Sequence, residues 1–305
     1  MLWMHYKVNL SSETESYAML SEENDPDTAV IFVHGFTGGP TETWLNFQSL
    51  VDDVESVEPL FRSSDLYFYA YESLRDNVAV HAARLAQFIH RVFPSPEFPS
   101  ACKMSIAMRQ FIPVPADADR GIRRSYQQVV LVGHSLGCVL VRQVIVDECL
   151  NYENTPRSRA LLEPVSSLLN GQLRLFAPAM FGFNPIGPQG FLYHFALNHQ
   201  RLKSFVGPAL ESLSIHQDLK ADSARLRRVQ ERTEELAQKH PDWACLRAHL
   251  LYGAKESVIY MERFECDPVC EIVEEQDHVS VCKPRPSYTK PLDFVGYGLS
   301  KSARA

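Results

Sequence analysis

The run Gly133-His134-Ser135-Leu136-Gly137 sets a serine between two glycines, after an apolar segment (129–132) and before another (138–141). A serine on a sharp turn between a buried strand and a helix is typical of a nucleophile elbow. The residues that flank such a serine must be small because the turn is tight. The start of the following helix favours the negative charge that develops when the hydroxyl attacks a carbonyl. The pattern therefore predicts that Ser135 is a nucleophile, rather than a chance serine in a glycine-rich turn.

A serine hydroxyl is a weak nucleophile until a base takes its proton. Proteins that use this elbow carry the serine first, then an acid, then a histidine along the chain. Only one of the eleven histidines, His278, follows the last predicted strand (269–274). We therefore predict that His278 is the base. His34 and His134 are interpreted as structural residues.

The acid must orient the imidazole and stabilise its cation. No Asp or Glu lies between Pro164 and Leu210, which excludes an acid at the end of the strand predicted for 173–177. The next predicted strand (248–252) is followed by a glycine, a short turn and Glu256. Glu256 is therefore the predicted acid. Asp267 and Asp277 remain alternatives.

A tetrahedral intermediate also needs preorganised donors, which are usually two backbone N–H groups. The residue after the nucleophile, Leu136, supplies one. The loop His34-Gly35-Phe36, which follows the apolar run 29–33, is suited to supply the other from Phe36. The glycines that come next allow this loop to curl and leave space for a substrate.

Short apolar runs alternate with helical patterns along the chain. This alternation predicts an α/β fold with a mostly parallel central sheet and helices on both faces. We expect strands at 4–10, 17–20, 29–33, 65–71, 128–132, 173–177, 248–252 and 269–274, and helices at 43–52, 77–92, 135–150, 218–239 and after His278.

Two segments interrupt this alternation within a predicted single domain spanning residues 1–305. The segment 94–124 contains five prolines and is expected to be a loop insertion. The segment 178–242 is expected to form a helical lid, with a decorative helical insertion as the alternative. Six aromatic residues lie between Phe176 and Phe195. Two of them, Phe181 and Phe183, are predicted to bind an apolar part of a substrate.

Composition excludes several classes of protein. The chain has 305 residues, of which 45% are hydrophobic and 22% charged, as in an ordinary globular protein. A net charge of −7 argues against a non-specific nucleic-acid binder. No apolar run approaches the roughly 18 residues of a membrane span, and the N-terminus does not resemble a secretory signal. We therefore expect a cytoplasmic protein.

The seven cysteines are an odd number and are expected to be reduced thiols. Cys266 and Cys270, with His278 and Cys282 nearby, lack a standard zinc spacing, so neither a metal nor an organic cofactor is expected. The arginines between residues 225 and 232 are interpreted as the solvated face of a helix, with peripheral membrane contact as the alternative. The sequence indicates no particular oligomeric state.

Taken together, these residues resemble the alpha/beta-hydrolase superfamily over nearly the whole chain. The stretches His34 to Gly39 with Thr43-Trp44, and His278 with Val281 to Pro284, resemble the serine-active-site lipase and esterase branch related to GPI-remodelling lipases. The resemblance implies a serine hydrolase that cleaves a carboxylic ester or lipid, through a Ser-His-Glu triad and an acyl-enzyme. The residues also allow a thioesterase, amidase or lactone hydrolase acting on a small metabolite or drug. A non-catalytic interaction module that kept the fold is a further alternative.

Overall fold

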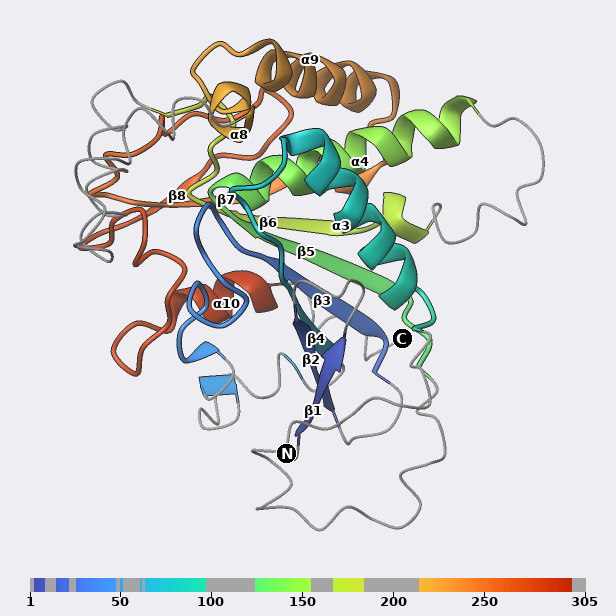
Figure 1. Cartoon of the computed structure of the whole chain (residues 1–305), viewed down its shortest axis with the longest axis vertical. Coiled ribbons are helices and arrows are strands. Elements are labelled where there is room, and N and C mark those ends of the chain that lie inside the picture. Colours follow the sequence, from blue (N-terminus) through green and yellow to red (C-terminus); the bar gives the residue numbers. More distant parts are fainter. Residues whose placement is uncertain are drawn as a thin grey trace.

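The computed structural model describes residues 3–8, 15–21, 26–47, 50–51, 61, 64–96, 124–154, 167–183 and 214–297 (Figure 1). Within this part, one eight-stranded sheet has the order β1-β2-β4-β3-β5-β6-β7-β8. The first two strands run antiparallel to their neighbours, and the other six are parallel. The predicted mostly parallel sheet is confirmed. Its strands are β1 (Trp3–Val8), β2 (Ser16–Ser21), β3 (Thr28–Val33), β4 (Ser64–Tyr69), β5 (Gln128–His134), β6 (Gln172–Phe176), β7 (Ala248–Gly253) and β8 (Glu271–Val273).

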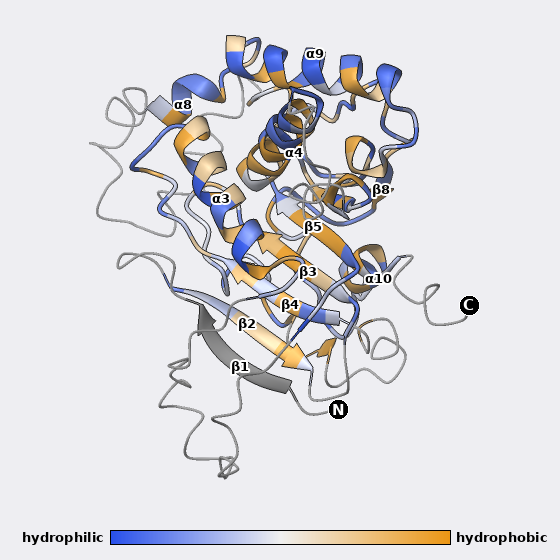
Figure 2. Cartoon of the chain, turned by 90° about the vertical axis from the view of Figure 1, so that its right-hand side faces the viewer, coloured by the Kyte–Doolittle hydropathy of each residue, from blue (hydrophilic) through white to orange (hydrophobic). Residues whose placement is uncertain are grey.

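The central strands β3 and β4 are buried at every position. Strands covered on both faces are continuously apolar, which explains why the run 29–33 could be recognised in the sequence. Parallel neighbours need crossover connections, and helices provide them. The helices are α3 (Val78–Val92), α4 (Leu136–Asn154), α8 (Ser214–Asp218), α9 (Ala224–Lys239), the short 3₁₀-helix η2 (Ala244–Leu246) and α10 (Lys290–Gly296). Figure 2 shows the hydrophobic strands β3 and β5 beneath the helices α3, α4 and α9.

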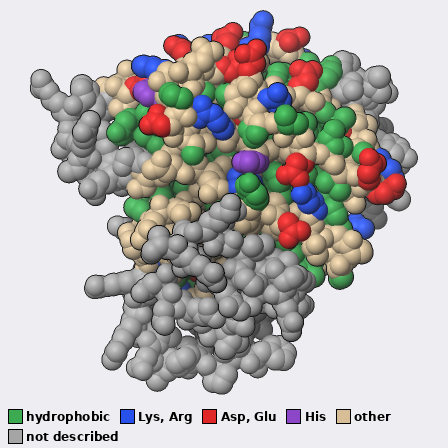
Figure 3. All heavy atoms as spheres, turned by 180° about the vertical axis from the view of Figure 1, so that it is seen from behind, with side chains coloured by type: hydrophobic (Ala, Val, Ile, Leu, Met, Phe, Trp, Pro, Cys, Tyr) green, Lys and Arg blue, Asp and Glu red, His purple; other side chains and the backbone are tan. Residues whose placement is uncertain are grey.

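The predicted helix at 218–239 begins later in the structure, as α9 (Ala224–Lys239), and Asp218 is the last residue of the preceding helix α8. The chain turns between α8 and α9, with Asp222 at a φ of 59°. Ser223 then caps α9, because its Oγ accepts the N–H of Leu226 at 3.2 Å. The outward face of α9 mixes exposed Arg227, Arg228 and Arg232 with glutamates, and charges of both signs are intermixed at the top of the molecule in Figure 3. Three of the four arginines of this helix are therefore exposed.

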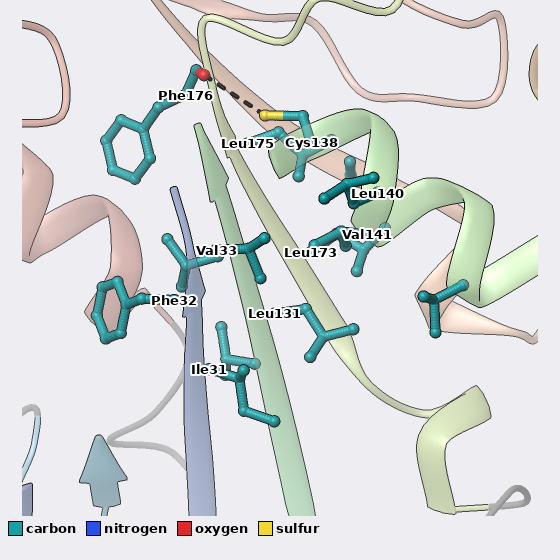
Figure 4. Packing of buried hydrophobic residues seen from close by; sticks show 14 of the residues in the cluster. Ile31, Phe32, Val33, Leu131, Cys138, Leu140, Val141, Leu173, Leu175 and Phe176 are labelled. Atoms are coloured by element: carbon teal, nitrogen blue, oxygen red, sulfur yellow. Dashed lines mark hydrogen bonds between the residues drawn. The ribbon is translucent and has the colours of Figure 1, made fainter. Parts of the chain in front are cut away.

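Helices cover both faces of the sheet. On one face α3 packs on α4, and α9 packs on the other side of α4. In Figure 4, Leu131 and Leu173 point toward α4, whereas Phe32 and Phe176 point to the opposite face. There Phe176 meets Phe294 of α10, with their ring centroids 4.9 Å apart. Successive side chains of a strand thus pack on opposite faces of the sheet and form two separate apolar layers, one on each face.

The two predicted insertions lie largely outside the described residues. Of the segment 94–124, residues 97–123 are not described, and of the segment 178–242, residues 184–213 are not described. The described part of the second segment includes α9, which connects β6 to β7 and lies over α4. Among the described helices, none has both the length and the hydrophobicity needed to cross a membrane.

Candidate active site

Ser135 occupies the turn between β5 and α4 and has a φ of 53°. A serine in this left-handed region is strained, as expected for a residue held by its surroundings at a functional turn. The neighbouring glycines are required by close packing. A Cβ on Gly137 would lie 2.2 Å from the carbonyl oxygen of Val33, and one on Gly133 would lie 2.8 Å from the Cα of Cys138. The local geometry is therefore that of the predicted elbow.

The predicted nucleophile, base and acid lie in one line of hydrogen bonds. The Nε2 atom of His278 is 3.0 Å from the Oγ of Ser135, and its Nδ1 is 2.9 Å from the Oε2 of Glu256. The carboxylate can only accept, so Nδ1 carries the proton and Nε2 is left to accept from the hydroxyl. The other carboxylate oxygen accepts the N–H groups of Val258 at 2.8 Å and Ile259 at 3.3 Å. The side chain of Glu256 is completely buried and is held in position by these contacts.

The two alternative acids have other partners. Asp267 is buried, forms an ion pair with Arg142 of α4 and accepts the N–H of Ala248 at 2.7 Å. Asp277 uses its Oδ1 to accept the N–H groups of Val279 at 3.0 Å and Ser280 at 2.8 Å. The structure thus brings Glu256 to the imidazole, whereas Asp267 braces α4 and Asp277 caps the turn that carries His278.

The loop that contains Phe36 runs directly beside the nucleophile. A Cβ on Gly35 would lie 3.0 Å from the Cβ of Ser135, so only glycine allows this approach. The N–H of Gly38 bonds to the carbonyl of Gly35 at 3.1 Å, and Thr37 within this turn has a φ of 54°. Leu136 begins α4, where N–H groups have no acceptor within the helix. Both predicted donor residues are therefore in segments adjacent to Ser135.

Three side chains that the sequence analysis missed or took as merely structural support this loop. The ring of His34 donates from Nδ1 to the carbonyl of Gly35 at 2.8 Å and stacks on Tyr71, with centroids 4.2 Å apart. The Tyr71 hydroxyl donates to the His34 carbonyl at 2.8 Å. Burial lowers the pKa of His34 to about 4, so the ring is neutral near pH 7. The Oγ of Ser73 accepts the N–H of Thr37 at 2.8 Å. No local signal identifies Tyr71 or Ser73, because they follow a different strand.

The two predicted substrate-binding aromatics have different environments. Phe181 lines a cavity of about 230 Å³, together with Met180, Leu226 and Tyr260 and with charged Asp222, Arg227 and Glu262. Phe183 is only 6% exposed, and its backbone forms isolated bridges with Lys220 and Ile259. Of the two, Phe181 is the one that faces a cavity, whereas Phe183 belongs to the core.

Cys266 and Cys270 are partly buried in the segment between β7 and β8. The Sγ of Cys266 is 3.4 Å from the carbonyl oxygen of Leu246. Within the described residues, no group of three or more His, Cys, Asp or Glu side chains is arranged to hold a metal ion.

The comparisons with known proteins agree with this geometry. A family model described as the alpha/beta hydrolase family matches residues 30–282. Peroxisomal alpha-beta-hydrolase Lpx1 from Saccharomyces cerevisiae is similar in structure, with a TM-score of 0.52 at 10% identity over 99% of this chain and 89% of that one. Pyrococcus furiosus esterase Pf2001 has a TM-score of 0.50 at 11% identity, over 97% of this chain and 90% of that one.

No curated protein matches the sequence. At such low identity the two structural likenesses show the fold alone, but the family model spans most of the chain. The resemblance to the superfamily is thereby confirmed, and the chain belongs to the alpha/beta hydrolase family.

Proposed function

We propose that the protein is a serine hydrolase that cleaves carboxylic esters with an apolar acyl chain. Membership of the alpha/beta hydrolase family supports hydrolase activity. The observation that carries the finer proposal is the unbroken line of hydrogen bonds from Ser135 through His278 to Glu256. Such a line supplies what a serine nucleophile needs, namely a base within reach and an acid that fixes the base in the right tautomer.

In the proposed reaction, the Oγ of Ser135 attacks the ester carbonyl while the Nε2 of His278 takes the hydroxyl proton. Glu256 stabilises the resulting imidazolium. The backbone N–H groups of Phe36 and Leu136 bind the oxyanion of the tetrahedral intermediate. His278 then returns the proton to the leaving alcohol, which leaves an acyl-enzyme. A water molecule, deprotonated by the same imidazole, releases the acid and restores the serine.

Apolar side chains near the site support an apolar acyl chain. Leu74 is 40% exposed and follows Ser73, which bonds to the loop of Phe36. Val279 is 37% exposed and follows the proposed base directly. Contact with such surfaces removes methylene groups from water, at up to about 0.8 kcal/mol for each buried CH₂.

A fluorophosphonate probe and a series of p-nitrophenyl esters from acetyl to octanoyl test the proposal. The probe is expected to label Ser135, and kcat/KM is expected to rise several-fold for every two carbons up to hexanoyl. Ser135→Ala is the matched control. It should remain folded, lose the label and lose about 10³-fold or more in kcat.

The other outcomes separate the alternatives. Labelling of Ser135 with a flat or falling chain-length profile would overturn the apolar ester and favour a thioesterase, amidase or lactone hydrolase acting on a small polar substrate. Absence of labelling, with no turnover above that of Ser135→Ala, would overturn catalysis and favour an interaction module.

A further inference from the structure

His134 precedes the proposed nucleophile, and its side chain turns into the protein, where it is only 8% exposed. Its Nε2 lies 2.7 Å from the backbone carbonyl oxygen of His278. A carbonyl can only accept, so the Nε2 of His134 carries a proton and donates it. The two imidazole rings are tilted by 49°, with centroids 5.1 Å apart.

The ring of His134 is not suited to act as a second base, because it is buried and its affinity for a proton is low. Burial, together with the nearby imidazole of His278, lowers its pKa to about 3, so it is neutral near pH 7. Its Nδ1 is buried and has no hydrogen-bond partner within the described residues. This atom faces Gly35, since a Cβ on that glycine would lie 2.9 Å from it. The ring is thus wedged between the loop of Phe36 and the loop of the proposed base.

Two hydrogen bonds therefore join the same pair of segments. In one, the Ser135 hydroxyl donates to the Nε2 of His278, and this bond lies on the proton path. The other runs from the His134 side chain to the His278 backbone and lies off that path. The second bond holds the backbone of the base at a set distance from the strand end that carries the nucleophile.

We propose that His134 is a positioning residue, whose Nε2–H holds the backbone of His278 so that the imidazole stays in line with Ser135. The proposal rests on the proposed function, since the position of His278 affects the rate only if His278 is the base that deprotonates Ser135. A base displaced by about 1 Å can cost about 10²-fold in rate. Loss of this bond should consequently lower the rate of the chemical step and leave substrate binding nearly unchanged.

The test compares His134→Met with His134→Gln. Methionine has a similar length and no donor, whereas the amide nitrogen of glutamine reaches about the position of Nε2. His134→Met is expected to lower kcat for p-nitrophenyl hexanoate by about 10- to 100-fold, with KM changed less than about threefold. The rate of labelling by the fluorophosphonate probe should fall in proportion. His134→Gln should restore both rates to within a few-fold of the wild type.

His249→Met is the matched control, because His249 is a half-buried histidine near the start of β7, whereas the proposed catalytic residues follow the other ends of the strands. Its kcat should equal that of the wild type. The thermal midpoints of all variants show whether each is folded at the assay temperature. If His134→Met does not fold, His134→Asn replaces it, since an asparagine amide is too short to reach the carbonyl of His278.

Two results would overturn the proposal. One is a His134→Met or His134→Asn variant with wild-type kcat and labelling rate. The other is equal loss in the glutamine and donor-less variants, which would assign the effect to ring packing. Failure of the proposed function is distinguishable, because Ser135→Ala would then keep its activity or the probe would label another residue.

Discussion

Two buried carboxylates in the segment after β7 have opposite surroundings. The side chains of Glu256 and Asp267 are 0% and 2% exposed. Glu256 accepts two backbone N–H groups and Asp267 accepts one, and each has one cationic or titratable side-chain partner. For Glu256 this partner is the imidazole of His278, and for Asp267 it is the guanidinium of Arg142.

The difference lies in what the partner can do next. A guanidinium stays charged at any ordinary pH, so the Arg142 pair cannot pass a proton on. Arg142 also donates to the carbonyl of Leu246 at 2.8 Å, which ties α4 to the chain just before β7. An imidazole can gain and lose a proton near neutral pH, and its second nitrogen faces Ser135. Burial and backbone hydrogen bonds are therefore common to the structural carboxylate of Asp267 and the proposed catalytic carboxylate of Glu256, and only the partner differs.

Glu256→Gln should have the largest effect and should act on activity. The amide keeps the shape of the side chain but removes the charge that orients and stabilises the imidazolium. We expect kcat to fall by about 10²- to 10⁴-fold, measured with p-nitrophenyl hexanoate. A nearly active Glu256→Gln protein, together with an inactive and folded Asp267→Asn protein, would reverse the comparison.

Asp267→Asn should act on stability. The substitution leaves the Arg142 guanidinium buried without an anion, which costs about 3–5 kcal/mol of unfolding free energy. Urea unfolding followed by circular dichroism measures this loss. At a temperature where the variant is folded, kcat should be close to that of the wild type. Unchanged unfolding free energy would show that the ion pair does not brace α4.

His81 sharpens the comparison, because it is a buried titratable group whose two ring nitrogens have no hydrogen-bond partner within the described residues. Burial lowers its pKa to about 4. Between about pH 6.5 and pH 4 the unfolded chain therefore binds a proton that the folded chain does not. Stability falls as the pH falls through this range, by up to about 1.4 kcal/mol per pH unit for each such group.

His81→Phe should remove this contribution. Urea unfolding at pH 7.5, 6.0 and 5.0 should show a shallower loss of stability in the variant than in the wild type. At pH 7.5 the variant should be as stable or more stable, since an apolar ring replaces unpaired polar atoms. Parallel curves for the two proteins would contradict the prediction.

Asp277→Ala should have the smallest effect. It removes the carboxylate that caps the turn at Val279 and Ser280, which typically costs about 1 kcal/mol. Because His278 keeps its contacts with Glu256 and His134, we expect kcat to change by less than about tenfold. A loss as large as that of Glu256→Gln would make Asp277 a rival for the acid.

The sequence by itself determined features whose signal is local. The buried strands β3 and β5 can be recognised in the sequence as continuous apolar runs, because a strand covered on both faces has no polar side. Gly133 and Gly137 bracket Ser135 because any side chain there would collide with the neighbouring backbone. The predicted positions of Ser135 at a strand end and of His278 after the last strand follow from chain order alone.

The tertiary structure alone decided which distant side chains meet. Ser135 and His278 are 143 positions apart, and Asp267 finds Arg142 across 125 positions. The strand, glycine and short turn before Glu256 favoured it as the acid, but only the fold shows that Glu256 meets His278 whereas Asp267 meets Arg142. The hydrogen bonds by which Tyr71, Ser73 and His134 support the loops of the site also depend on the tertiary structure. Their partners lie on other loops at the same edge of the sheet, and only the folding of the parallel strands brings those loops together.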